Sequence, residues 1–266
     1  MWVGQAEKER ELEAAGLGGL GLAYRALGDA RQAIEFHKQC LAIERGIGAR
    51  YGEGVALGNL GTAYHELGDM RPAIEFYEQQ LTIAREISDW HGEGAALGNL
   101  GAAYRELGDS RQGIRFLQQA LTIAREIGER HGEGIALGNL GDAYYSLGDT
   151  QQAVRFFEEA LAIAREIGDR VGERLALGNL GVSYRDLRDA HQAIRFSEQS
   201  LAIAREIGDM TGAAWISLNL ALLLFNQGRQ AGALRYAEFA AQAYAQAGHA
   251  QDAQKAQQLI DHLRRQ

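Results

Sequence analysis

The sequence is poor in the residues that several protein classes depend on. Its 266 residues include one cysteine, Cys40, and one proline, Pro72. A single cysteine excludes an internal disulfide, and the seven histidines do not stand at the spacing of a metal site. We therefore predict neither a metal nor another cofactor, and we expect Cys40 to be a buried, unreactive thiol.

Long apolar segments are also missing. The longest apolar run, Leu220 to Phe225, is far too short to span a bilayer, and Met1 to Arg10 lacks the apolar core of a signal peptide. These absences predict a soluble, cytoplasmic protein with no membrane partner.

Positive charge is scarce as well. The chain has three lysines and a formal net charge of −8, so we expect no general attraction to nucleic acid or anionic lipid. The other basic residues are arginines, which suit planar, bidentate pairing with carboxylates.

What the sequence does contain is a repeat of 40 residues. The string Gly-Asn-Leu-Gly occurs at 58–61, 98–101, 138–141 and 178–181, with weaker copies at Leu20-Gly21 and Asn219-Leu220. Self-similarity at a fixed period is the signature of a repeat architecture. We predict a single domain over 1–266, with a capping helix at 249–266 after six approximate repeats at 10–48, 50–88, 90–128, 130–168, 170–208 and 210–247.

Each repeat is predicted to form two helices. Apolar residues follow a period of 3.6 in both halves of the repeat, as in Leu57, Leu60, Tyr64 and Leu67 and then in Ala73, Ile74, Tyr77, Leu81 and Ala84. Between the halves, Gly68 can end the first helix in a left-handed conformation and Asp69 can cap the second. Glycine inside a helix is costly, so we expect Gly61 to allow close packing of the two helices.

These motifs resemble the tetratricopeptide repeat. Leu60-Gly61, Tyr64 and Ala73 match its signature, and the match recurs through nearly the whole chain. The ordinary unit has about 34 residues, and the 40-residue unit is most similar to the Partner-of-Inscuteable and kinesin-light-chain groups and to arrays in bacterial signalling proteins. The early tryptophan and the final proline of the family are absent, with Leu57 and Arg85 in their places. The resemblance implies an all-α fold, a right-handed superhelical solenoid of six helix-turn-helix repeats.

The resemblance also implies a concave groove lined by the first helices. The family's groove positions correspond to a ladder of Asn59, Asn99, Asn139, Asn179 and Asn219, with Arg25, His65, Arg105, Tyr145 and Arg185 beside it. An asparagine amide both donates and accepts, so a row of them can pair with the backbone of an extended peptide. In the alternative, each amide bonds to its own or a neighbouring helix, and the arginines pair with Glu66, Glu106 or Asp186 on a neighbouring repeat.

The sixth repeat differs at these positions. It carries an apolar set made of Trp215, Leu218, Leu222 and Phe225. Such a surface is unusual where it faces water. Either the C-terminal helix or a neighbouring chain covers it, or it forms a pocket for an apolar side chain of a partner.

Catalytic motifs are not evident. Gly52-Glu53-Gly54 recurs and follows no strand, so it is not a nucleotide-binding loop, and the recurring carboxylates and His91 and His131 are expected to be structural or exposed. We predict a scaffold, not an enzyme, that binds an extended peptide of a partner protein. The alternatives are a self-associating homo-oligomeric module, a regulatory or sensor segment of a larger signalling protein, a designed or recently duplicated array and, disfavoured by acidity, an RNA binder.

Overall fold

The computed structural model of the chain describes residues 2–265, with side chains from residue 7 onward. All regular elements in this range are α-helices, which confirms the all-α prediction for the described part of the chain. The helices recur with the predicted period, because the odd-numbered helices from α3 onward begin at Arg50, Trp90, Arg130, Arg170, Met210 and Ala250.

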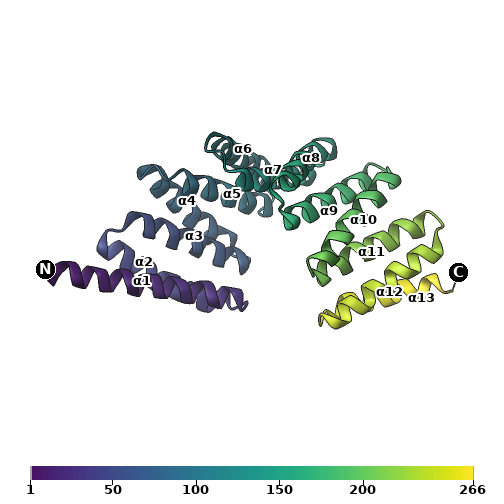
Figure 1. The fold of residues 1–266 in the computed structure, drawn as a ribbon, viewed down its shortest axis with the longest axis horizontal. Helices are drawn as coiled ribbons and strands as arrows, with labels where there is room; N and C mark the ends of the chain where they lie inside the picture. Colours follow the sequence, from purple (N-terminus) through teal and green to yellow (C-terminus); the bar gives the residue numbers. More distant parts are fainter. Residues whose placement is uncertain (1, 266) are drawn as a thin grey trace. The chain divides into compact units, whose positions relative to one another are not determined.

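The chain divides into two compact units, Met1–Leu147 and Gly148–Gln266. In unit 1, consecutive helices pack on one another (Figure 1): α1 (Trp2–Ala26), α2 (Ala30–Ile47), α3 (Arg50–Glu66), α4 (Met70–Glu86), α5 (Trp90–Glu106), α6 (Ser110–Glu126) and α7 (Arg130–Ser146). The odd-numbered helices of this unit also contact one another in sequence, so they form one layer. The prediction of one domain and its repeat boundaries stays a prediction.

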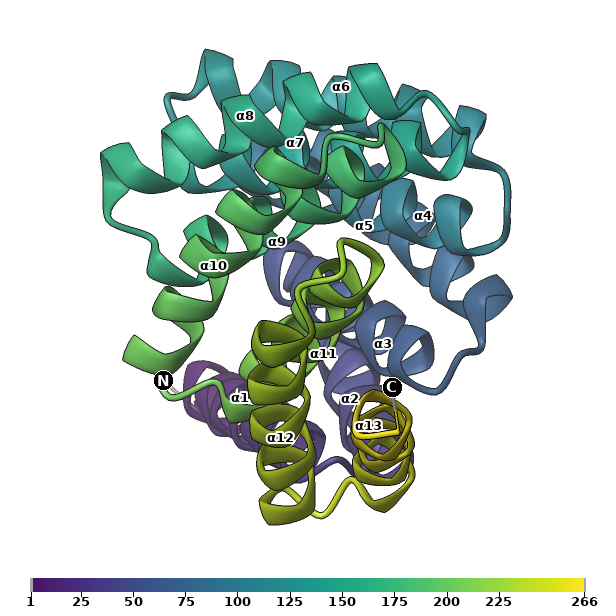
Figure 2. The same ribbon diagram turned by 90° about the vertical axis from the view of Figure 1, so that its right-hand side faces the viewer.

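Unit 2 is built in the same way. Consecutive helices again pack on one another, and α13 lies beside α12 (Figure 2). The helices of unit 2 are α8 (Thr150–Ile167), α9 (Arg170–Asp186), α10 (Ala190–Glu206), α11 (Met210–Asn226), α12 (Gln230–Gln246) and α13 (Ala250–Leu263).

Aspartates start most of the second helices. The Asp109 carboxylate accepts a hydrogen bond from the Gln112 backbone N–H at 3.0 Å, and Asp29, Asp149 and Asp189 make the equivalent bond. The expectation that Asp69 does the same is wrong, since its side chain makes no capping bond. The reason is Pro72, which stands where the other repeats have glutamine and has no N–H to donate.

Left-handed residues end the helices, as expected from the glycines. Gly68, for example, has φ +82°. Two such positions carry other residues: Ser88 has φ +56° and Arg188 has φ +62°. A side chain at these positions is strained, because a left-handed conformation brings Cβ close to the backbone.

The helices of a repeat meet at glycine. A Cβ on Gly61 would lie 2.4 Å from the Tyr77 ring, and one on Gly101 would lie 2.4 Å from Leu117 Cγ. These contacts confirm the predicted close approach. Aromatic stacking adds to it, with ring centroids of Tyr64 and Phe76 5.4 Å apart.

His37 occupies the corresponding core position in the first helix pair. It is fully buried, and neither ring nitrogen has a hydrogen-bond partner. Burial lowers the pKa of the imidazole, and the nearby Arg25 charge lowers it further. Cys40 is also buried, as predicted, and burial raises the pKa of its thiol.

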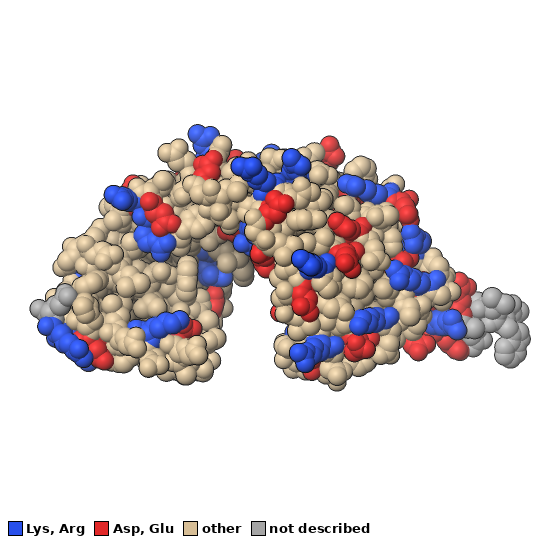
Figure 3. All heavy atoms as spheres, turned by 180° about the vertical axis from the view of Figure 1, so that it is seen from behind, with Lys and Arg blue, Asp and Glu red and all other residues tan. Residues whose placement is uncertain are grey.

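An ion-pair clamp joins successive repeats. Buried Glu53 accepts from Arg45 Nε at 2.8 Å and from Arg50 Nη1 at 2.6 Å, and Arg50 also pairs with Glu86. Burial alone would raise the pKa of Glu53, but hydrogen bonds from the two arginines outweigh it and lower that pKa. Arg170 likewise pairs with Glu173 and Glu206. Basic and acidic side chains accordingly stand next to one another over the face shown in Figure 3.

Helices α1 and α13 are the first and last helices of the described chain. Helix α1 begins at Trp2, because residues 5–13 are mostly strong helix formers without a breaker. At the other end, Ile260 and Leu263 of α13 are buried in the core of unit 2 with Leu220 and Leu223 of α11. Helix α13 therefore covers apolar surface, as a capping helix does.

Candidate functional site

The asparagines of unit 1 lie on its odd-numbered helices. Asn59, Asn99 and Asn139 are half-buried on α3, α5 and α7. Within residues 7–265 their side-chain amides form no hydrogen bond to the protein, in contrast to the alternative in which they tie neighbouring helices together. A half-buried amide without a partner in its own chain retains full capacity to pair with a ligand.

The asparagines of unit 2 behave differently. The Asn219 amide donates to the Trp215 carbonyl oxygen of its own helix at 3.1 Å, which is the alternative that the sequence left open. Asn179 is half-buried on α9. The binding role predicted for the whole ladder stays a prediction, and unit 1 carries the stronger geometry for it.

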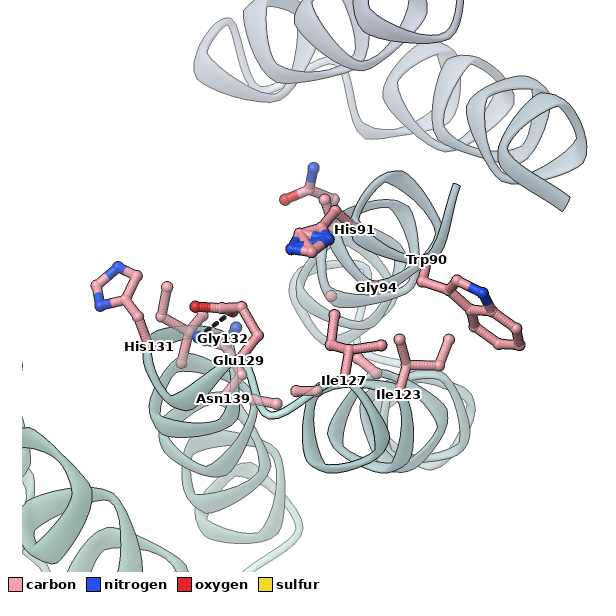
Figure 4. A pocket seen from close by; sticks show the side chains of 16 residues that line it. Trp90, His91, Gly94, Ile123, Ile127, Glu129, His131, Gly132 and Asn139 are labelled. Carbon is pink, nitrogen blue, oxygen red and sulfur yellow. Dashed lines mark hydrogen bonds between the residues drawn. The ribbon is translucent and has the colours of Figure 1, made fainter. Parts of the chain in front are cut away.

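Two of these asparagines line one pocket. A pocket of about 300 Å³ lies between α5, α6 and α7, and Asn99 and Asn139 are among its lining residues (Figure 4). Its apolar wall comes from Ile123 and Ile127 of α6 and Ile135 of α7. Figure 4 shows the two α6 isoleucines pointing into the space between α5 and α7. The volume suits one large side chain or a small apolar group.

Other side chains stand at the rim of this pocket. His91 and His131 are exposed, as expected, and Trp90 of α5 is 51% exposed beside Ile123. The Glu129 carboxylate accepts a hydrogen bond from the Gly132 backbone N–H and so caps α7. The pocket therefore has apolar walls and a polar rim.

A smaller pocket lies one repeat earlier. Its volume is about 190 Å³, and Gly54, Ile83 and Ile87 stand at the positions of Gly94, Ile123 and Ile127. In α9 the corresponding glycine is replaced by Arg174, whose Nε lies 3.2 Å from the Asp209 carboxylate. A side chain thus occupies in α9 the position that glycine leaves open in α3 and α5.

The basic residues predicted beside the ladder form ion pairs. Arg25 pairs with Glu66 at 3.4 Å, Arg105 with Glu106 at 3.3 Å and Arg185 with Asp186 at 3.0 Å, while His65 Nε2 lies 2.9 Å from Glu106. The Arg25–Glu66 pair joins neighbouring repeats, as in the alternative expected from the sequence, whereas Arg105 and Arg185 each pair with the next residue of their own helix. Tyr145 is half-buried at the end of α7. The predicted ligand role of these residues stays a prediction.

The apolar set of the sixth repeat is partly covered. Leu218 packs against a cluster that includes Tyr244, and the Phe225 ring meets His262 of α13 edge-on at 5.4 Å. Trp215 and Leu222 remain 47% and 44% exposed. The C-terminal helices therefore contact half of the set, and the other half faces outward from unit 2.

Sequence reasoning missed Trp90 and the isoleucines of α6. Trp90 stands where Arg50, Arg130 and Arg170 begin the equivalent helices, so its departure from the repeat was a usable signal. Ile123 and Ile127 recur in other repeats and so look like ordinary core residues. Only the structure shows that Gly94 and Gly98 leave space beside them.

Two further features are absent from residues 2–265. No helix there is both long enough and apolar enough to cross a membrane. In the same part of the chain, no three side chains of the kinds that ligate metals lie together.

Solved structures with the same fold come from several kinds of protein. A Rap protein complexed with Competence and Sporulation Factor superposes with a TM-score of 0.71 at 17% identity, over 96% of this chain and 75% of that one. A signal transduction ATPase with a tetratricopeptide repeat sensor from Pyrococcus horikoshii gives 0.74 at 22% identity, over 96% of this chain and 39% of that one. A putative kinesin light chain with nearly identical repeats from Podosopora anserina gives 0.61 at 22% identity, over 73% and 96%.

At these identities the likeness shows the fold alone, and it confirms the fold class predicted from the sequence. No curated protein sequence is significantly similar to the chain. A family model described as Tetratricopeptide repeat matches residues 12–86, 92–166 and 173–246, which follow the helix pairs described above. With this match over most of its length, the chain belongs to the tetratricopeptide repeat family.

Proposed function

We propose that the chain is an interaction scaffold that binds an extended segment of a partner protein along the odd-numbered helices of unit 1. The observation that carries this proposal is the unpaired state of the Asn59, Asn99 and Asn139 amides, two of which line an apolar pocket. Extended peptides are recognised by backbone hydrogen bonds together with pockets for side chains. The helices supply both features on one face.

The charges of the chain fit a protein partner better than a polyanion. The net charge is −8, and the arginines near the ladder pair with carboxylates at 3.0 to 3.4 Å. A phosphate backbone is bound by cations that are free to contact it, and these three arginines already pair with carboxylates of the chain. In the similar Rap protein, the same fold is seen in complex with Competence and Sporulation Factor.

A matched pair of double variants tests the proposal. Asn99→Ala/Asn139→Ala removes two ladder amides, while Gln39→Ala/Gln118→Ala removes two exposed amides from α2 and α6. Each protein is used to select binders from a displayed library of random dodecapeptides, with circular dichroism as the check on folding. We expect selected peptides to lose binding to the asparagine variant and to keep it with the glutamine variant. Equal binding to both variants would remove the ladder from the proposal.

Self-association is the second candidate, because Trp215 and Leu222 expose apolar surface on α11. A second copy of the chain covering them would make a homo-oligomer. Sedimentation of the native chain and of Trp215→Gln over a range of concentrations separates this candidate from the first. A constant monomer mass for both proteins would exclude it.

A regulatory role within a longer protein is a third candidate. The fold matches the signal transduction ATPase with a tetratricopeptide repeat sensor, of which the chain spans 39%. A sensor segment would bind its ligand through the same face, so the peptide selection described above serves this candidate as well.

A further inference from the structure

The clamp between successive repeats is interrupted at α5, between helices that carry it. Arg50 and Arg170 begin α3 and α9, and each bridges a buried glutamate of its own helix to a glutamate at the end of the next helix. Helix α5 begins with Trp90 at this position. An indole cannot form these ion pairs. Helix α5 therefore lacks the bridge that Arg50 and Arg170 form, and it carries a large exposed ring instead.

The interruption leaves a carboxylate without a cation. Glu126 ends α6 and is the counterpart of Glu86 and Glu206, which pair with Arg50 and Arg170. Among the described residues Glu126 forms no hydrogen bond or ion pair, and it is exposed. The other acid of the clamp, Glu93, keeps Arg85 at 2.8 Å. Since Arg50 reaches Glu86 and Arg170 reaches Glu206, a long side chain at position 90 would reach the unpaired Glu126 carboxylate.

The larger pocket lies at this same interruption. Ile127, the residue after Glu126, lines the pocket together with Trp90 and with Ile135, which is 51% exposed. Figure 4 shows Trp90 at one end of the pocket and His131 at the other. The apolar pocket and the exposed indole therefore adjoin the end of α6, where Glu126 carries an unpaired carboxylate. Aromatic residues at the edge of a pocket are typical anchors of protein interfaces.

We propose that this pocket binds a partner segment carrying a large apolar side chain with an arginine or lysine close by. The apolar side chain enters the space between Ile123, Ile127 and Ile135. The cation pairs with Glu126 and lies against the Trp90 ring, an arrangement favoured by charge and by cation–π attraction. The proposal rests on the proposed function, since it assigns a sequence preference to the same face of unit 1.

Two variants remove the pocket in different ways. Trp90→Arg gives α5 the residue found at the start of α3, α7 and α9, and so supplies a partner for Glu126. Gly94→Arg copies Arg174, and its side chain would fill the pocket and reach Glu129 as Arg174 reaches Asp209. A Cβ at Gly94 would lie 3.6 Å from Ile123, which is ordinary contact, so the helix accommodates it. Met210→Arg serves as the control, because Met210 begins α11 at the position equivalent to Trp90 and is 41% exposed.

Displayed random dodecapeptides are the probe, and the readout is the sequence of those selected by the native chain. We expect a large apolar residue within three positions of an arginine or lysine. Binding of such a peptide, measured by fluorescence anisotropy, should weaken about tenfold or more with Trp90→Arg or Gly94→Arg and stay unchanged with Met210→Arg. Exchange of its basic residue for glutamate should weaken it similarly, and Glu126→Lys should then restore binding of the exchanged peptide.

Three results would overturn the proposal. These are selected peptides without a basic residue, binding that survives both pocket variants, and failure of Glu126→Lys to reverse the charge preference. Peptides that depend on Asn99 and Asn139 but not on Trp90 would overturn the pocket proposal alone and leave the groove in place. Absence of any selected peptide would count against both.

Discussion

The ring of His37 lies against Gly21, so closely that a Cβ on the glycine would be 2.4 Å from the imidazole. Leu117 holds the same position against Gly101, which shows that the site accepts an aliphatic side chain. The imidazole differs in bringing two nitrogens into the core without partners. Buried polar atoms without hydrogen bonds are destabilising.

We expect His37→Leu to raise the free energy of unfolding by about 1–2 kcal/mol at neutral pH. The folded-state pKa of His37 lies below its ordinary value of 6.5, so the unfolded chain binds the proton more readily. Stability of the native chain should therefore fall as the pH drops below 6.5, and the advantage of the variant should grow. Urea unfolding between pH 8 and pH 5 measures this, with the exposed His191→Leu as control. If the stability gained by His37→Leu became smaller toward acid pH, the lowered pKa of the buried His37 would be contradicted.

Two glycines of α5 should respond oppositely to alanine. A Cβ on Gly98 meets nothing within 4 Å, so Gly98→Ala should stabilise the chain by about 1 kcal/mol through helix propensity. A Cβ on Gly101 would lie 2.4 Å from Leu117 Cγ and 3.1 Å from the Gly113 carbonyl oxygen. Gly101→Ala should therefore destabilise the chain by about 1–3 kcal/mol. Thermal unfolding of both variants checks the pair, and shifts of the same sign would refute the packing argument.

The clamp at Glu53 should contribute stability that depends on pH. Its folded-state pKa is below the ordinary value of 4.5, so the contribution is complete above that pH and is lost as the pH falls through the lower, folded-state pKa. Glu53→Gln should lower the unfolding midpoint in urea at pH 7, and the difference from the native chain should narrow toward pH 3. Glu75→Gln, at an exposed position on α4, is the control and should leave the midpoint unchanged. A difference that persists at pH 3 would show that packing, not charge, holds the clamp.

Replacement of the strained residues at the helix ends by glycine should raise the free energy of unfolding. Ser88 and Arg188 adopt positive φ at positions where the other repeats place glycine. Relief of the strain exceeds the entropy that glycine costs, so Ser88→Gly and Arg188→Gly should each stabilise the chain by about 0.5–1 kcal/mol. Calorimetric melting temperatures measure the gain, and Gly68→Ser should show the corresponding loss.

Much of the fold was predictable because the same pattern of apolar residues, glycines and caps recurs every 40 residues. The stripe at Leu57 and Leu60, the close approach at Gly61 and the left-handed Gly68 each follow from a period or a residue type. Asp69 shows that a role inferred from one repeat does not always hold in another. Its capping role failed because Pro72 removes the donor, a change three residues away in a motif that otherwise matches.

The candidate site was less accessible to sequence reasoning. The asparagine positions followed from a family resemblance, but whether an amide bonds within its own helix, as Asn219 does, depends on rotamers and neighbours. The pocket depends on space left between α5, α6 and α7, and volume is a property of packing. Trp90 was visible in the sequence as a departure from Arg50 and Arg170. Its meaning required the structure, which shows Glu126 without a cation.

The recurrence of the clamp makes the length of the array adjustable. Arg85 contacts Glu93 as Arg125 contacts Glu133, each with the same Nε to carboxylate distance of 2.8 Å. Excision of residues 88–127 would therefore bring Arg85 and Glu133 into the same ion pair that Arg85 now forms with Glu93. Insertion of another copy of these residues would lengthen the array and repeat the same pairs. Such a chain can gain or lose whole repeats while each new junction matches an existing one. A single repeat can therefore differ in sequence from the others, as the one beginning at Trp90 does, without changing the junctions of its neighbours.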